Sequence, residues 1–232
     1  MGDARIAGVG TPGGLRRGWS SRRAATLSAV VALVACAGLS LTTTAAIGLD
    51  SHCEASPGGR GPVSAAAVNA SIKCYLAFGF ATSQTLSSET AAQAGCAQDP
   101  AQFLNALASG LQPLATSGEQ DVAATATAKT TYFSAEQSWY AERRKNGVVS
   151  LLGRIVTQIA TVKEQDTAFY SDLGLLAAEW SALDCGAAQN ALNRATTDQA
   201  QTGSAHASIV GLLSQLDDCV NGSAKRRKTA CR

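Results

Sequence analysis

The segment Gly147–Leu183 carries an apolar stripe that constrains the fold more than any other feature of the chain. Its apolar residues recur at alternating steps of four and three: Val148, Leu152, Ile155, Ile159, Val162, Phe169, Leu173, Leu176, Trp180 and Leu183. Only Asp166 interrupts the series. This spacing predicts an amphipathic helix about 55 Å long, at about 1.5 Å per residue. A strict seven-residue repeat also favours coiled-coil packing against neighbouring helices.

A second stripe begins after the break at Asp184-Cys185-Gly186. Its members are Leu192, Ala195, Gln199, Thr202, His206, Ile209, Leu213, Leu216 and Val220. They predict a second helix of about 34 residues. We expect a tight turn at Gly186 to fold this helix antiparallel onto the first one.

The preceding chain adds two more helical arms. Helical spacing of apolar residues predicts a helix from Ser64 to about Ala94, which Gly95 ends. Asp99-Pro100 is typical of a helix start, and the short helix that follows is expected to end near Pro113.

Ser117 and Gln120 resemble a capping box, which would open another helix from about Gly118 to Lys145. The two pieces would then form one arm bent at the proline, and Asn146-Gly147 would turn the chain. The prediction is an all-α, elongated antiparallel up-and-down bundle over residues 63–220.

The N-terminus has the order of an export signal. Arginines precede an apolar run from Ala24 to Leu41, and small residues follow at 44–46. We therefore predict an export signal at residues 1–46 and an irregular leader at 47–62. There are two alternatives to a cleaved signal. Residues 24–49 could be retained as a membrane anchor, or Cys36 could be lipidated.

Charge argues against a nucleic-acid partner. The chain has 19 basic and 17 acidic residues. Five of the basic residues and one of the acidic residues lie in residues 1–46, so the rest of the chain is slightly acidic.

Residues 221–232 form a basic tail, predicted to be loose, that contains Lys225, Arg226, Arg227 and Lys228. Such a cluster is typical of a solvated tail. Processing at paired basic residues, or contact with an anionic surface, are its functional alternatives.

Six cysteines remain outside the signal, and an even number behind an export signal predicts three disulfides: Cys53, Cys74, Cys96, Cys185, Cys219 and Cys231. A helix between Cys185 and Cys219 would hold them about 50 Å apart, so they cannot pair. The antiparallel arrangement brings Cys96 and Cys185 to one end and predicts their disulfide. The remaining connectivity stays open, with Cys53, Cys219 and Cys231 nearer the other end.

The two polar interruptions of the stripes, Asp166 and His206, fall at the same level of the predicted hairpin. A buried carboxylate without a partner is costly, so the alignment predicts a polar pair that fixes helix register. A pH-sensitive switch is the functional alternative.

Other sequence features carry little chemistry. The chain has two histidines and no Cys-x-x-Cys, Walker loop or nucleophile motif, so we expect neither an enzyme nor a metal or other cofactor. Asn69 and Asn221 lie in N-glycosylation sequons. The aromatic pairs Tyr132-Phe133 and Trp139-Tyr140 are expected in the core rather than in a ligand groove.

A short segment at the end of the first stripe resembles a known family. Ala182-Leu183-Asp184-Cys185, followed by Cys219, is similar to the Leu-x-Asp-Cys…Cys segment of secreted plant inhibitors of invertase and pectin methylesterase. Those inhibitors are disulfide-bearing four-helix bundles, and their closely spaced N-terminal cysteine pair is not matched here. The resemblance implies a non-catalytic inhibitor as one form of a binding protein.

The sequence therefore predicts a secreted or cell-surface structural or interaction module with an unknown protein partner. A carrier or sensor of a small apolar ligand held between helices is the competing interpretation. A membrane would be contacted only through residues 24–49, if they are retained.

Overall fold

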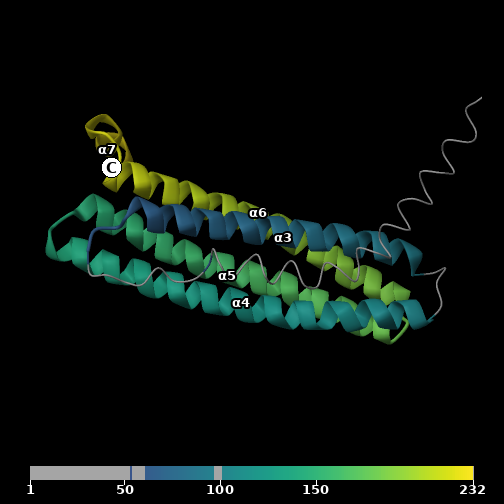
Figure 1. Ribbon diagram of the computed structural model, residues 1–232. Helices are drawn as coiled ribbons and strands as arrows, with labels where there is room; N and C mark the ends of the chain where they lie inside the picture. Colours follow the sequence, from purple (N-terminus) through teal and green to yellow (C-terminus); the bar gives the residue numbers. More distant parts are fainter. Residues whose placement is uncertain (1–52, 54–60, 97–100, 232) are drawn as a thin grey trace, which may run out of the picture.

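A computed structural model describes residue 53 and residues 61–96 and 101–231, and every regular element in them is a helix. The helices are α3 (Ala65–Gly95), α4 (Ala101–Glu142), α5 (Asn146–Ser181), α6 (Cys185–Val220) and α7 (Ala224–Ala230). The four long helices alternate in direction and form an elongated bundle (Figure 1). The predicted all-α, disulfide-stapled bundle is confirmed. The export signal, Cys36 and most of the predicted leader lie outside the described residues.

Helix α5 makes the most extensive contacts with other helices of the bundle, as its apolar stripe predicts. It packs against α4 on one side and α6 on the other, and α3 packs on α6. All apolar members of its stripe are buried except Leu183, which is 48% exposed because it lies in the turn after the helix. No helix of the described residues is apolar over a length sufficient to cross a bilayer.

The two turns beside α5 do not use glycine. Residues 143–145 join α4 to α5 and residues 182–184 join α5 to α6, with positive φ at Arg144 (53°) and Leu183 (60°). The expected turn at Gly186 is wrong by a few residues. The Asp184 side chain accepts hydrogen bonds from the N–H groups of Gly186 and Ala187, at 3.0 and 2.9 Å. This N-cap starts α6 at Cys185 and places Gly186 inside the helix.

Helix α4 is continuous, so the predicted arm in two pieces is wrong. Pro113 lies within the helix, and the Ser117 hydroxyl donates to the carbonyl of Leu114 at 3.2 Å instead of capping a new helix. Leu111, Ala115 and Gly118 are all buried, on both sides of the break expected at the proline. Packing along α5 therefore outweighs the lost hydrogen bond, which costs about 3 kcal/mol at an interior proline.

The C-terminal tail is ordered, which corrects the expectation of a loose segment. Residues 224–230 form α7, which folds back beside the end of α6 (Figure 1). Gln215 of α6 donates to the carbonyl of Ala230 at 2.8 Å, and Cys231 is bonded to Cys219. The disulfide closes a short loop, so the tail cannot leave α6 freely.

The core divides into two clusters along the bundle. We call the first the tryptophan half; its largest buried members are Phe78, Leu104, Leu111, Phe169, Tyr170, Leu173, Leu176, Trp180 and Leu192. We call the second the tail half; its largest buried members are Tyr75, Phe133, Tyr140, Leu151, Leu152, Ile155, Ile159, Ile209, Leu213 and Leu216. The boundary on α5 falls between Val162 and Phe169, which is the position of Asp166.

Candidate functional site

A buried polar layer separates the two halves of the core. The Nε2 atom of His206 on α6 lies 2.9 Å from Oδ2 of Asp166 on α5, and the side chains are 5% and 3% exposed. When Nε2 carries the proton, the imidazole is the donor and the carboxylate oxygen accepts. The structure thus brings together the two residues that the antiparallel alignment placed at one level.

Helix α3 closes this layer with aromatic rings. Ring centroids of Tyr75 and Phe78 lie 6.0 and 6.4 Å from that of His206. A Cβ added at Gly79 would lie 3.0 Å from Nδ1 of His206, so glycine at this position lets α3 approach the imidazole. The roles of Tyr75 and Gly79 were not predicted from the sequence, because neither residue type marks a polar layer. The buried polar residues Ser71 and Thr82 of α3 lie before and after them in the chain.

Four buried polar atoms in the layer have no hydrogen-bond partner among the described residues. They are Tyr75 Oη, Asp166 Oδ1, Thr202 Oγ1 and His206 Nδ1. Burial raises the pKa of Tyr75 well above its usual value, and the charge of Asp166 raises it further. The adjoining hollow, lined in part by Tyr75, Phe78 and Val122, holds about 10 Å³. That volume is room for one water molecule at most.

The layer resembles part of a catalytic triad only in composition. Thr202 lies one helical turn before His206, but its hydroxyl makes no hydrogen bond to the imidazole. Thr202 is 0% exposed and His206 4%, so no substrate reaches them unless the helices separate. The geometry is that of a structural pair: a shift of α5 along α6 would leave the carboxylate against apolar side chains, which is costly.

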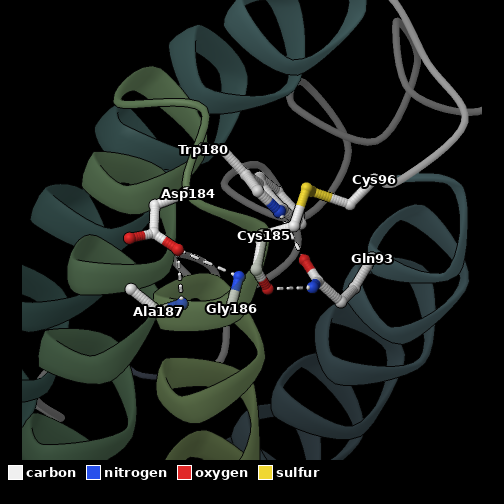
Figure 2. Close-up of a disulfide and its surroundings, with 7 residues drawn as sticks. All are labelled: Gln93, Cys96, Trp180, Asp184, Cys185, Gly186 and Ala187. Carbon is white, nitrogen blue, oxygen red and sulfur yellow. Dashed lines mark hydrogen bonds between the residues drawn. A yellow bond between two sulfur atoms is a disulfide. The ribbon is translucent and has the colours of Figure 1, made fainter.

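The disulfide at the opposite end from α7 belongs to a second polar cluster, shown in Figure 2. Cys96, after α3, is bonded to Cys185 at the start of α6. Trp180 donates through its indole N–H to the Gln93 side-chain oxygen at 2.7 Å, and the Gln93 amide donates to the Cys185 carbonyl at 2.9 Å. The buried indole therefore has its partner, and three helices are joined at this end.

The Cys96–Cys185 disulfide is the pair that the antiparallel arrangement predicts. The structure also settles the open connectivity: Cys53 pairs with Cys74 and Cys219 with Cys231. Cys74 lies in the buried face of α3, in the cluster that forms the tryptophan half. Cys53 therefore attaches along α3 instead of joining the cysteines of the tail.

The remaining predicted residues lie apart from these clusters. Asn69 is exposed on α3, and Asn221 is exposed at the C-cap of α6, where its amide donates to Asp217 at 2.9 Å. Phe133 and Tyr140 are buried, and Tyr132 and Trp139 pack against them from the edge of the core. Burial raises the pKa of Tyr132 to about 12. The aromatic pairs are core residues.

Two buried charged residues on α4 were also not predicted from the sequence. Lys129 and Glu136 are 2% and 3% exposed, and Glu136 Oε2 has no hydrogen-bond partner among the described residues. Burial lowers the pKa of Lys129 and raises that of Glu136. Their spacing of seven residues, two helical turns, could have marked them as inward-facing.

Neither metal-ligand geometry among the described residues nor similarity to another protein assigns a function to this chain. Within residues 61–96 and 101–231, no group of three or more His, Cys, Asp or Glu side chains could hold a metal ion. No protein-family model, curated protein or solved structure matches the sequence.

Proposed function

We propose that the protein is an extracytoplasmic, non-enzymatic interaction module that presents helix α3 to a protein partner. The observation that carries this proposal is an exposed apolar pair, Leu76 and Phe80, which are 57% and 64% exposed. They lie one turn apart on α3 and project from the same face of the helix. Large exposed aromatic side chains are enriched at protein interfaces.

The scaffold under this pair is well suited to recognition. Cys74, two residues before Leu76, is buried and bonded to Cys53, and the opposite face of α3 packs on α6. A helix held in place loses little further conformational entropy when it binds. Covering both side chains would contribute about 3 kcal/mol, or roughly a hundredfold in affinity.

Three disulfides support the extracytoplasmic part of the proposal, because disulfides persist in oxidising compartments. The competing role, a carrier of a small apolar ligand, finds less support. Side chains fill both halves of the core, and the hollow beside Asp166 holds about 10 Å³. Ligand pockets commonly hold about 300 Å³ or more. A larger hollow of about 850 Å³ between α5 and α6 is an open surface groove lined mainly by polar residues, among them Ser150, Arg154 and Gln158, and so does not suit an apolar ligand. A secreted enzyme inhibitor remains one form of interaction module.

The test is affinity capture with the exported protein as bait, followed by mass spectrometry of the bound proteins. We expect a specific partner that is lost with Leu76→Ser/Phe80→Ser. The matched control is Leu175→Ser/Leu183→Ser, which removes two other exposed apolar side chains, 44% and 48% exposed, from α5 and the turn that follows it. Capture that is equal with both variants, or absent with the native chain, would contradict the proposal.

A further inference from the structure

Two basic segments that are far apart in the sequence meet at one end of the bundle. We define the basic end as the α4–α5 turn, with Arg143, Arg144 and Lys145, together with α7, with Lys225, Arg226, Arg227 and Lys228. All seven side chains belong to exposed residues. Figure 1 shows α7 and this turn at the same end of the molecule.

A close backbone contact joins the two segments. Any Cβ at Gly147, in the first turn of α5, would overlap the carbonyl oxygen of Cys231, so glycine lets the chain after α7 lie directly against α5. The Cys219–Cys231 disulfide and the hydrogen bond from Gln215 to Ala230 hold α7 there. The basic end is therefore a feature of the fold and not of a loose tail.

Charge is strongly segregated between this end and the rest of the bundle. Seven of the twelve basic residues in the described chain lie here, with only three of its thirteen acidic residues, Glu142, Asp217 and Asp218. Arg143 pairs with Glu142 and Arg226 with Asp218, both at 3.3 Å and both exposed. Exposed pairs of this kind are weak, about 0–1 kcal/mol, so Arg226 stays available to a stronger anion. Arg143 is held more firmly, because it also lies 3.8 Å over the Trp139 ring and donates to the Trp139 carbonyl at 2.9 Å.

We propose that the basic end binds the anionic headgroups of a lipid bilayer. The cations project from a turn and from a short helix with no buried residue, so they present an open surface. Helix α7 is about 10 Å long, close to the Debye length at 0.1 M salt, so its charges act together on a charged plane. The proposal rests on the extracytoplasmic role above and names a second partner for it.

The N-terminal sequence favours a bilayer over an acidic protein, because residues 24–49 form the alternative membrane anchor. Three residues lie between Leu49, the last residue of that anchor, and Cys53, so at most about 14 Å of extended chain links the two. Cys53 is bonded to Cys74, which lies nine residues, or about 14 Å, after the first residue of α3. An anchor retained at residues 24–49 would therefore keep the bundle close to a bilayer.

The test measures co-sedimentation of the exported protein with neutral phosphatidylcholine vesicles and with vesicles containing one third phosphatidylglycerol. We expect binding to the anionic vesicles only, and its loss at 0.5 M salt. Each Lys or Arg near an anionic surface contributes about fivefold. Arg144→Gln/Lys145→Gln and Lys225→Gln/Lys228→Gln should therefore each weaken binding roughly 25-fold.

Lys73→Gln/Lys163→Gln is the matched control, because it removes two exposed cations from the sides of the bundle. This variant should bind within about twofold of the native chain, and Lys225→Arg/Lys228→Arg should bind like the native chain, because their basic ends keep every charge. Circular dichroism establishes that each variant keeps its helices.

Several results would overturn the proposal. The first is equal binding to neutral and anionic vesicles, and the second is no binding to anionic vesicles. The third is retention on heparin without vesicle binding. The fourth is weaker binding of Lys225→Gln/Lys228→Gln without weaker binding of Arg144→Gln/Lys145→Gln. The protein partner sought with Leu76 and Phe80 is an independent readout. Capture that persists while vesicle binding fails would reject the lipid surface and keep the proposed function.

Discussion

The two halves of the core are stabilised in different ways, although the same four helices run through both. The tryptophan half contains many buried alanines, and the Cys96–Cys185 disulfide closes its end across 89 residues. The tail half is built from larger aliphatic side chains, and its Cys219–Cys231 disulfide spans only 12 residues. Small side chains bury less apolar area, so the tryptophan half depends more on its cross-link.

This difference indicates why the chain has a disulfide at each end and a polar layer between the halves. A cross-link that closes a long loop removes more entropy from the unfolded chain than one that closes a short loop. The long-range disulfide therefore lies where hydrophobic stabilisation is smallest. The short one fixes α7 and leaves the tail half to its aliphatic packing.

The largest effect should come from Cys96→Ala/Cys185→Ala. Loss of this loop constraint should lower the free energy of unfolding by about 4–5 kcal/mol, against about 3 kcal/mol for Cys219→Ala/Cys231→Ala. Urea denaturation measures both values, and hydrogen exchange should show the tryptophan half losing more protection. Equal losses for the two double variants would contradict the comparison.

A smaller effect is expected from removing one large side chain in each half. Leu176 and Leu213 are both fully buried, so Leu176→Ala and Leu213→Ala should each lower stability by about 3 kcal/mol. The sites belong to different clusters, so the losses should add within about 0.5 kcal/mol in the double variant. Two separate unfolding transitions would show that the polar layer divides the bundle into independent units.

The polar layer itself is tested by a double-mutant cycle on Asp166→Asn and His206→Gln. Each change removes one partner of a buried hydrogen bond, and we expect a coupling energy of about 1–2 kcal/mol in urea unfolding. Gly79→Ala is a third probe, because its methyl group would press on His206. Additive effects of Asp166→Asn and His206→Gln would mean that the pair does not tie the two helices together.

An effect similar in size to that of the polar layer concerns one glutamate in each half. Burial raises the pKa of Glu89 to about 7 from 4.5, and burial also raises the pKa of Glu136. The folded state then holds a proton that the unfolded chain has released, so stability falls as pH rises from 4.5 to about 7. Glu89→Gln should add about 1–2 kcal/mol at pH 8 and nothing at pH 4.

Chemical denaturation across that pH range is the measurement. Glu136→Gln should change stability in the same direction, by removing a buried carboxylate oxygen that has no partner among the described residues. The exposed Glu142 is the control, and Glu142→Gln should leave the pH profile as it is. A gain from Glu89→Gln that is the same at pH 4 and pH 8 would contradict the titration.

Much of this molecule follows from local pattern. The α5 stripe predicted its helix within two residues at each end, because every member but Asp166 and Leu183 is a buried apolar side chain. Antiparallel counting then placed Asp166 beside His206 and Cys96 beside Cys185. The breaks expected at Pro113 and Gly186 were wrong, because tertiary packing on α5 and the Asp184 cap outweigh local preference.

The sequence by itself determined the helical class, the up-and-down direction of the long helices and the level at which their polar residues meet. The apolar periodicity and the length of each helical segment decide these features, and both are local properties of the sequence. Only the tertiary structure decided that α7 folds against Gly147, that Tyr75 and Gly79 complete the polar layer and that two basic segments form one end. These features depend on contacts between distant segments, which a pattern in one segment does not record.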